Sequence, residues 1–106
     1  MSDIRIKNAF ISVFCKQGLE VIVKKLSDLG VNIVSTGGSY DYITAAGVNA
    51  VKVEDITKYP SVLGGRVKTL HPLIFGGILA RRGNETDMKQ VAEYGMSLFD
   101  LVIVDL

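Results

Sequence analysis

The chain has 106 residues, of which 48% are hydrophobic and 22% charged, a composition typical of one globular domain rather than of a disordered segment. Twelve Lys and Arg face eleven Asp and Glu, and the formal net charge of +1 gives no electrostatic reason to expect binding to nucleic acid or an anionic membrane. A single Cys excludes an intrachain disulfide, and a single His excludes a His-rich metal site. No signal-peptide pattern is visible, and no apolar run approaches the roughly 20 residues that span a bilayer. We expect a cytoplasmic domain without a metal, nucleic-acid partner or membrane partner.

The first half of the chain alternates β-type runs with helical periodicity. Residues 9–13 predict a strand, and apolar residues at helical spacing over 19–29 predict a helix that Gly30 ends. Further strands are predicted over 31–34 and 50–53, with a short helix over 40–46 between them. This β-α-β-α-β order with short connections is typical of an α/β fold in which helices cover an open parallel sheet, as in Rossmann- and flavodoxin-like domains.

The second half is less regular in pattern. Residues 54–82 hold both prolines and several glycines, and we predict a functional loop followed by a short helix or strand over 73–79. A helix is predicted over 84–94, with Asn84 as its N-cap. The near-continuous apolar run over 99–106 predicts a last strand that is buried on both faces.

Polar residues that follow the strands are the first candidates for a site, because an open parallel sheet binds ligands beyond the carboxyl ends of its strands. The segment Ser12 to Lys16 brings a hydroxyl, backbone amides and an ammonium group to a predicted helix start, which favours an anion. A purely structural interpretation stays open, in which Ser12 or Cys15 caps the helix and Lys16 is solvated.

A second candidate is the glycine-rich turn of residues 35–39. Gly37 and Gly38 allow a ligand to approach the backbone closely, while Thr36 and Ser39 add hydroxyl groups and the following helix adds its dipole. These are the groups that a phosphate monoester requires. The turn has neither the Walker A lysine nor GxGxxG spacing, and an ordinary strand-to-helix turn is the alternative.

The third candidate lies in the segment GRVKTLHP, residues 65–72. Arg66 and Lys68 alternate and would point to one side of an extended segment, with Thr69 on the other. Arg suits bidentate recognition of an anion, and Lys either neutralises charge or acts in catalysis with a shifted pKa. A solvated basic loop is the structural alternative.

Taken in order, the Ser-x-x-x-Lys, STGGS and GRVKTLHP motifs, followed by FGGILARR, resemble the IMP cyclohydrolase domain at the N-terminus of the bifunctional AICAR transformylase/IMP cyclohydrolases of purine biosynthesis. The resemblance runs from Ala9 to the end of the chain and implies a methylglyoxal-synthase-like fold. It implies the conversion of the formamido ribotide FAICAR to IMP with loss of water and without a cofactor. The cofactor 10-formyltetrahydrofolate would belong to a transformylase domain that we expect to be absent here.

The resemblance also assigns residues to the site. Ser12, Phe14, Cys15 and Lys16 match the first nucleotide-binding loop, and Thr36, Gly37, Gly38 and Ser39 match the phosphate loop. Arg66, Val67, Lys68 and Thr69 match the third contact segment, with Lys68 in the place of a catalytic lysine.

Two departures from the family pattern affect what we expect of this chain. Cys15 stands where the family usually has Asp, and the sequence stops at Leu106, before a Tyr, an Asp and a Lys that the family uses in catalysis. We therefore expect residues 1–106 to be one incomplete domain of a longer, homodimeric protein, with weak or no turnover by themselves.

Two other functions stay open. A methylglyoxal-synthase-type lyase would need an acid beside the phosphate loop to act as base, and Asp41 is the acid directly after STGGS. A regulatory module that binds a nucleotide effector, as in carbamoyl phosphate synthetase, would need the binding loops and no catalytic partners.

Overall fold

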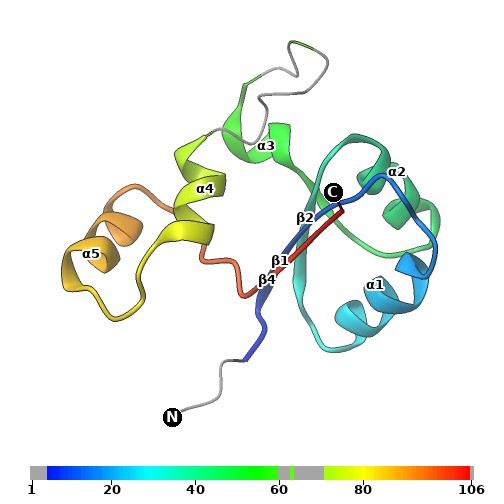
Figure 1. Ribbon diagram of the computed structural model, residues 1–106, viewed down its shortest axis with the longest axis horizontal. Helices are drawn as coiled ribbons and strands as arrows, with labels where there is room; N and C mark the ends of the chain where they lie inside the picture. Colours follow the sequence, from blue (N-terminus) through cyan, green and yellow to red (C-terminus); the bar gives the residue numbers. More distant parts are fainter. Residues whose placement is uncertain (1–4, 60–62, 64–70, 106) are drawn as a thin grey trace. The chain divides into compact units, whose positions relative to one another are not determined.

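The computed structural model describes residues 5–59, 63 and 71–105, which belong to two compact units (Figure 1). The first, Met1–Lys52 with Asp100–Leu106, holds the sheet and is called the α/β unit below. The second, Val53–Phe99, is called the helical unit.

The α/β unit is built on a parallel sheet with the strand order β3-β2-β1-β4. Every pairing is parallel, so the carboxyl ends of the strands meet at one edge of the sheet. The predicted α/β fold with an open parallel sheet is confirmed. The strands are β1 Asn8–Ser12, β2 Asn32–Ser35, β3 Val51–Lys52 and β4 Leu101–Val104.

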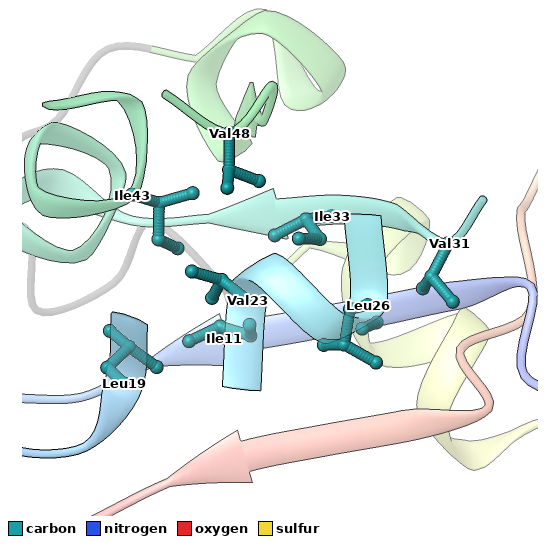
Figure 2. Packing of buried hydrophobic residues seen from close by; sticks show 9 residues of the cluster. Ile11, Leu19, Val23, Leu26, Val31, Ile33, Ile43 and Val48 are labelled. Atoms are coloured by element: carbon teal, nitrogen blue, oxygen red, sulfur yellow. The ribbon is translucent and has the colours of Figure 1, made fainter. Parts of the chain in front are cut away.

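Helices α1 (Leu19–Asp28) and α2 (Gly37–Ala45) pack on one face of this sheet and close its hydrophobic core (Figure 2). Each buried leucine or isoleucine side chain there contributes about 1.5–3 kcal/mol to folding. The core cluster consists of Ala9, Ile11, Leu19, Val23, Leu26, Val31, Ile33, Ile43 and Val48.

The apolar stripe of α1 is narrower than its sequence spacing predicts. Leu19, Val23 and Leu26 are buried, whereas Ile22 and Leu29 at the margins of the stripe are exposed. The predicted end at Gly30 is confirmed, since its φ is 76° and its N–H donates to the Ser27 carbonyl at 3.0 Å.

Two strand predictions need correction. The third strand ends at Lys52 rather than 53, because Val53 already begins helix α3 (Val53–Thr57). The last strand, β4, is not buried on both faces. It pairs with β1 at the edge of the sheet, and the side chains of Val102 and Val104 are 40% and 53% exposed. An apolar sequence is typical of a strand that is covered on both faces, but it does not determine which faces other elements of the fold cover.

The helical unit contains α3, α4 (Pro72–Leu79) and α5 (Glu85–Glu93). The apolar run over 73–79, predicted as helix or strand, is a helix that Pro72 begins, and the His71 side chain caps it by accepting from the Leu73 N–H at 3.1 Å.

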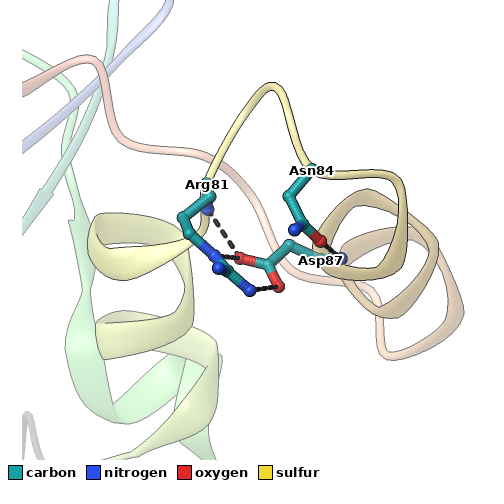
Figure 3. A network of polar contacts seen from close by, with 3 residues as sticks. All are labelled: Arg81, Asn84 and Asp87. Atoms are coloured by element: carbon teal, nitrogen blue, oxygen red, sulfur yellow. Dashed lines mark hydrogen bonds and ion pairs between the residues drawn. The ribbon is translucent and has the colours of Figure 1, made fainter.

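Helix α5 begins as its sequence predicts. The Asn84 Oδ1 accepts from the Asp87 N–H at 2.9 Å, which confirms the predicted cap (Figure 3). The Asp87 carboxylate in turn accepts from the Arg81 backbone N–H and guanidinium at 2.8–3.1 Å. Arg81 thereby lowers the pKa of the Asp87 carboxyl. Within the described part of the chain, no helix has the length and apolar character that crossing a membrane requires.

Candidate functional site

The candidate site lies where β1, β2 and β4 end in the α/β unit. The register pairs Ile11 with Ser35 and Ser12 with Val104, so the segments that follow these three strands leave the same edge of the sheet. The first two of these segments are the Ser12–Lys16 loop and the first turn of α2, which the sequence marked as separate candidates.

Hydroxyl groups join these two segments directly. The Ser12 Oγ lies 2.7 Å from the Thr36 Oγ1, within hydrogen-bond distance. The Ser39 Oγ accepts from the Val13 N–H and donates to the Val13 carbonyl, both at 2.9 Å. Thr36 and Ser39 are 6% and 2% exposed, whereas their partners Ser12 and Val13 are half-buried, so both contacts are partly shielded from water. The two segments that the sequence marked as separate candidates are therefore joined by direct hydrogen bonds.

Helix α2 starts earlier than its sequence predicts. It begins at Gly37 rather than at residue 40, with Thr36 as its N-cap. The Thr36 side chain does not cap the helix, because its Oγ1 is engaged with Ser12. The amides of Gly37, Gly38 and Ser39 thus form a first turn without a side-chain acceptor from the cap, and such N–H groups attract anions.

The backbone of this turn is open to a ligand. Gly37 and Gly38 are exposed, and the one described side chain that a Cβ placed on Gly38 would meet within 4 Å is Lys16, whose Nζ would lie at 3.7 Å. The ammonium of Lys16 therefore lies beside the first turn of α2. A positive charge next to helix N-terminal amides is an arrangement that binds a phosphate monoester.

The Ser12–Lys16 loop itself differs from the prediction. It is not a helix start, because α1 begins only at Leu19, after Gly18 with a φ of 80°. Neither Ser12 nor Cys15 acts as the helix cap. Lys16 is half-buried, and its Nζ donates to the carbonyls of Val13 and Phe14. Lys16 is thus fixed by its own loop rather than solvated.

Asp105, directly after β4, is a residue of this site that the sequence analysis missed. Its carboxylate accepts from the Phe14 N–H at 2.9 and 3.0 Å and from the Cys15 N–H at 2.7 Å. The hydrogen bond from Cys15, then the one from Phe14, and more weakly the charge of Lys16, lower the pKa of the Asp105 carboxyl. The last strand was predicted to run to residue 106 and so to contain Asp105, whereas β4 ends at Val104 and leaves Asp105 among the polar residues that follow a strand.

The remaining predicted residues lie elsewhere. Arg66, Val67, Lys68 and Thr69 fall outside the described residues, so the structure places none of them. Asp41, the base that a lyase would need, is exposed on α2. Among the residues described, no group of three or more His, Cys, Asp and Glu could hold a metal ion.

The helical unit has a cavity of its own, and its chemistry differs from that of the loops. It measures about 520 Å³, and no Lys or Arg is among the described residues that line it. The lining residues are His71, Pro72, Leu73, Gln90, Tyr94 and Met96.

Comparison with known proteins identifies the family of the chain. The family described as "MGS-like domain" matches residues 18–106. A protein of Bacteroides thetaiotaomicron named "Bifunctional purine biosynthesis protein PurH" is 55% identical over 102 residues, which are 96% of this chain and 20% of that protein. The protein of the same name from Bacillus subtilis is 46% identical over 101 residues, 95% of this chain and 20% of that one.

A solved structure supports the fold independently. The structure described as "Crystal structure of ForH" superimposes with a TM-score of 0.85 at 36% sequence identity, and the match covers 96% of this chain and 53% of that one. The chain thus spans about a fifth of the length of the curated relatives that it matches.

Proposed function

The chain belongs to the MGS-like domain family, and from that premise we propose that it is the ring-closing part of a purine-biosynthesis protein. The proposed reaction converts FAICAR to IMP: the carboxamide nitrogen attacks the formyl carbon, and water leaves from the tetrahedral intermediate. The similarity to proteins named for purine biosynthesis, at 46–55% identity over almost the whole chain, supports this reaction over others that the fold accommodates.

One observation carries the proposal: hydrogen bonds join the Ser12–Lys16 loop to the first turn of α2, so that the Lys16 ammonium lies beside the amides of that turn. The contact between Ser12 and Thr36 and the position of Lys16 beside Gly38 support a site for the 5′-phosphate of a nucleotide. We assign the phosphate to the amides of Gly37, Gly38 and Ser39, with the Lys16 ammonium as its counter-charge.

The same proposal gives roles to the rest of the predicted residues. Phe14 and Cys15 complete the first nucleotide loop, and Arg66, Val67, Lys68 and Thr69 contact the substrate near the reacting groups. Lys68 acts as the catalytic cation that stabilises charge developing on the formyl oxygen. The cyclisation itself uses no cofactor. We further propose that the protein acts in the cytoplasm as a homodimer, with purine nucleotides rather than nucleic acid or membrane as its partners.

Nucleotide titration tests the proposal. Isothermal titration calorimetry of the 106-residue chain with IMP, a purine ribotide and UMP should show binding of the purine nucleotides and little binding of UMP. Lys16→Met is expected to weaken IMP binding about tenfold, because it removes one charge-assisted contact to phosphate. Lys24→Met is the matched control. It removes an exposed ammonium that pairs with Glu20 at 2.8 Å on α1, and it should leave the affinity unchanged.

Three results would contradict the proposal. Preference for UMP would indicate a regulatory nucleotide module, and formation of methylglyoxal from dihydroxyacetone phosphate would indicate a lyase with Asp41 as a candidate base. Equal effects of Lys16→Met and Lys24→Met would mean that Lys16 does not contact the nucleotide.

A further inference from the structure

The Asp105 carboxylate is one of two structural supports of the Ser12–Lys16 loop. On the side of β4, Asp105 accepts from the backbone amides of Phe14 and Cys15 at 2.7–3.0 Å. On the side of α2, the Ser39 hydroxyl binds both backbone polar groups of Val13 at 2.9 Å. The loop is therefore held on one side by the residue that follows β4 and on the other by the first turn of α2.

The loop in turn determines where Lys16 points. Its Nζ donates to the carbonyls of Val13 and Phe14, so the ammonium follows the orientation of those two peptide groups. Asp105 binds both of these peptide groups, because the Phe14 N–H shares a peptide group with the Val13 carbonyl and the Cys15 N–H shares one with the Phe14 carbonyl. A change at Asp105 is thereby transmitted through the two peptide groups to the ammonium beside Gly38.

We propose that Asp105 is a positioning residue, whose carboxylate holds the Ser12–Lys16 loop so that the Lys16 ammonium faces the anion-binding first turn of α2. This inference rests on the proposed phosphate site and adds to it a group that does not touch the ligand. It also gives a role to the charged residue that directly follows β4, whose last residue, Val104, is apolar and exposed.

A competing role for Asp105 would be that of an internal anion that occupies the ligand's place. The geometry favours positioning instead. Asp105 binds amides of Phe14 and Cys15 after β1, whereas the ligand amides are those of Gly37–Ser39 at the start of α2. The two sets of N–H groups belong to different segments, and a phosphate on α2 does not need the ones that Asp105 fills.

The chain offers a matched control for this carboxylate. Asp100, just before β4, also accepts from two consecutive backbone amides, those of Lys7 and Asn8, at 2.7 and 3.1 Å. It does so at the amino end of β1, away from the edge where the candidate site lies. Asp105→Asn and Asp100→Asn remove the same charge from the same kind of contact, and they differ in the segment that each contact supports.

The experiment measures the affinity of inorganic phosphate by amide NMR titration for the wild-type chain, Asp105→Asn, Asp105→Glu and Asp100→Asn. We expect about tenfold weaker binding in Asp105→Asn, recovery to within about threefold in Asp105→Glu, and wild-type affinity in Asp100→Asn. The rate of Cys15 thiol modification reports the loop directly, because Cys15 is exposed and its N–H donates to Asp105. That rate should change in Asp105→Asn and not in Asp100→Asn. Circular dichroism confirms that each variant is folded.

The outcomes separate this inference from the function on which it rests. If the wild-type chain does not bind phosphate, the proposed phosphate site is wrong, and the positioning role falls with it. If the wild-type chain binds phosphate and Asp105→Asn binds equally well, only the positioning role is overturned. Tighter binding by Asp105→Asn would overturn it too, because Asp105 would then compete with the ligand.

Discussion

The buried hydroxyl of Ser39 provides the strongest test of how the site is built into the fold. Ser39→Ala removes the group that accepts from the Val13 N–H and donates to the Val13 carbonyl, both at 2.9 Å. The carbonyl keeps Lys16 as a donor, but the N–H loses its acceptor in a position where Ser39 is 2% exposed. An unsatisfied buried donor costs about 1–3 kcal/mol, so we expect the free energy of unfolding to fall by about 2 kcal/mol. For a chain of this length that corresponds to roughly 8–12 °C in Tm.

Thr44→Ala is the matched control for this prediction. Its hydroxyl lies on the same helix and donates to the carbonyls of Tyr40 and Asp41 at 2.9 and 3.2 Å, but Thr44 is exposed. Water replaces such a contact, and Ala favours helix, so its free energy of unfolding should change by less than about 0.5 kcal/mol. Urea denaturation followed by circular dichroism measures both variants. If Ser39→Ala is no less stable than Thr44→Ala, Ser39 does not fasten the loop to the helix.

Three further predictions concern packing and charge. Gly77→Ala would place a Cβ 2.2 Å from the Ser97 carbonyl oxygen and should lower the free energy of unfolding by about 1–3 kcal/mol in urea denaturation. A Cβ on Gly83 would meet none of the described residues within 4 Å, so Gly83→Ala is the control that should leave the stability unchanged. Ile43→Ala empties a fully buried core position and should cost about 2–5 kcal/mol in urea denaturation. The pKa of Asp105 is lowered in the folded chain, so its ionised form stabilises the fold, fully so above the unfolded value of about 3.9. That contribution is lost as the pH falls through the folded pKa, and a stability profile of Asp105→Asn measured from pH 6 to 2 should lack this component.

Sequence periodicity predicted the α/β unit well because the secondary structure that its sequence favours locally is the one that tertiary packing stabilises. The apolar spacing of α1, the helix-ending glycine Gly30 and the β-type runs that became β1 and β2 all indicate the structure that packing then stabilises. The cap at Asn84 was predictable for the same reason, since an Asn side chain satisfies a first-turn amide through short-range geometry alone.

The errors occurred where a neighbour decides the structure. The first turn of α2 contains two glycines, which are poor helix formers, so the helix was predicted to begin only at residue 40. The contacts of Ser39 with Val13 stabilise that turn from outside the helix. The apolar run of β4 was likewise predicted to be buried on both faces, although its place at the edge of the sheet leaves Val102 and Val104 exposed. Neither fact is encoded within the segment concerned.

Position 15 shows how the same limit applies to the site. A Cys there, where the resembling family usually has Asp, suggested that the first loop lacks a carboxylate beside Lys16. In the structure the carboxylate of Asp105 takes this place. Asp105 is 90 residues from Cys15 in sequence and is not part of the predicted motif. It reaches the loop because β1 and β4 pair in parallel with Ser12 opposite Val104, so the next residue of each strand emerges at the same place. A motif scan compares residue types at fixed spacing and cannot detect a charge that arrives through strand pairing. The carboxylate can be found only from the pairing of the strands. Although position 15 is Cys, the loop still has a negative charge beside it, because the Asp105 carboxylate accepts from the Phe14 and Cys15 N–H groups.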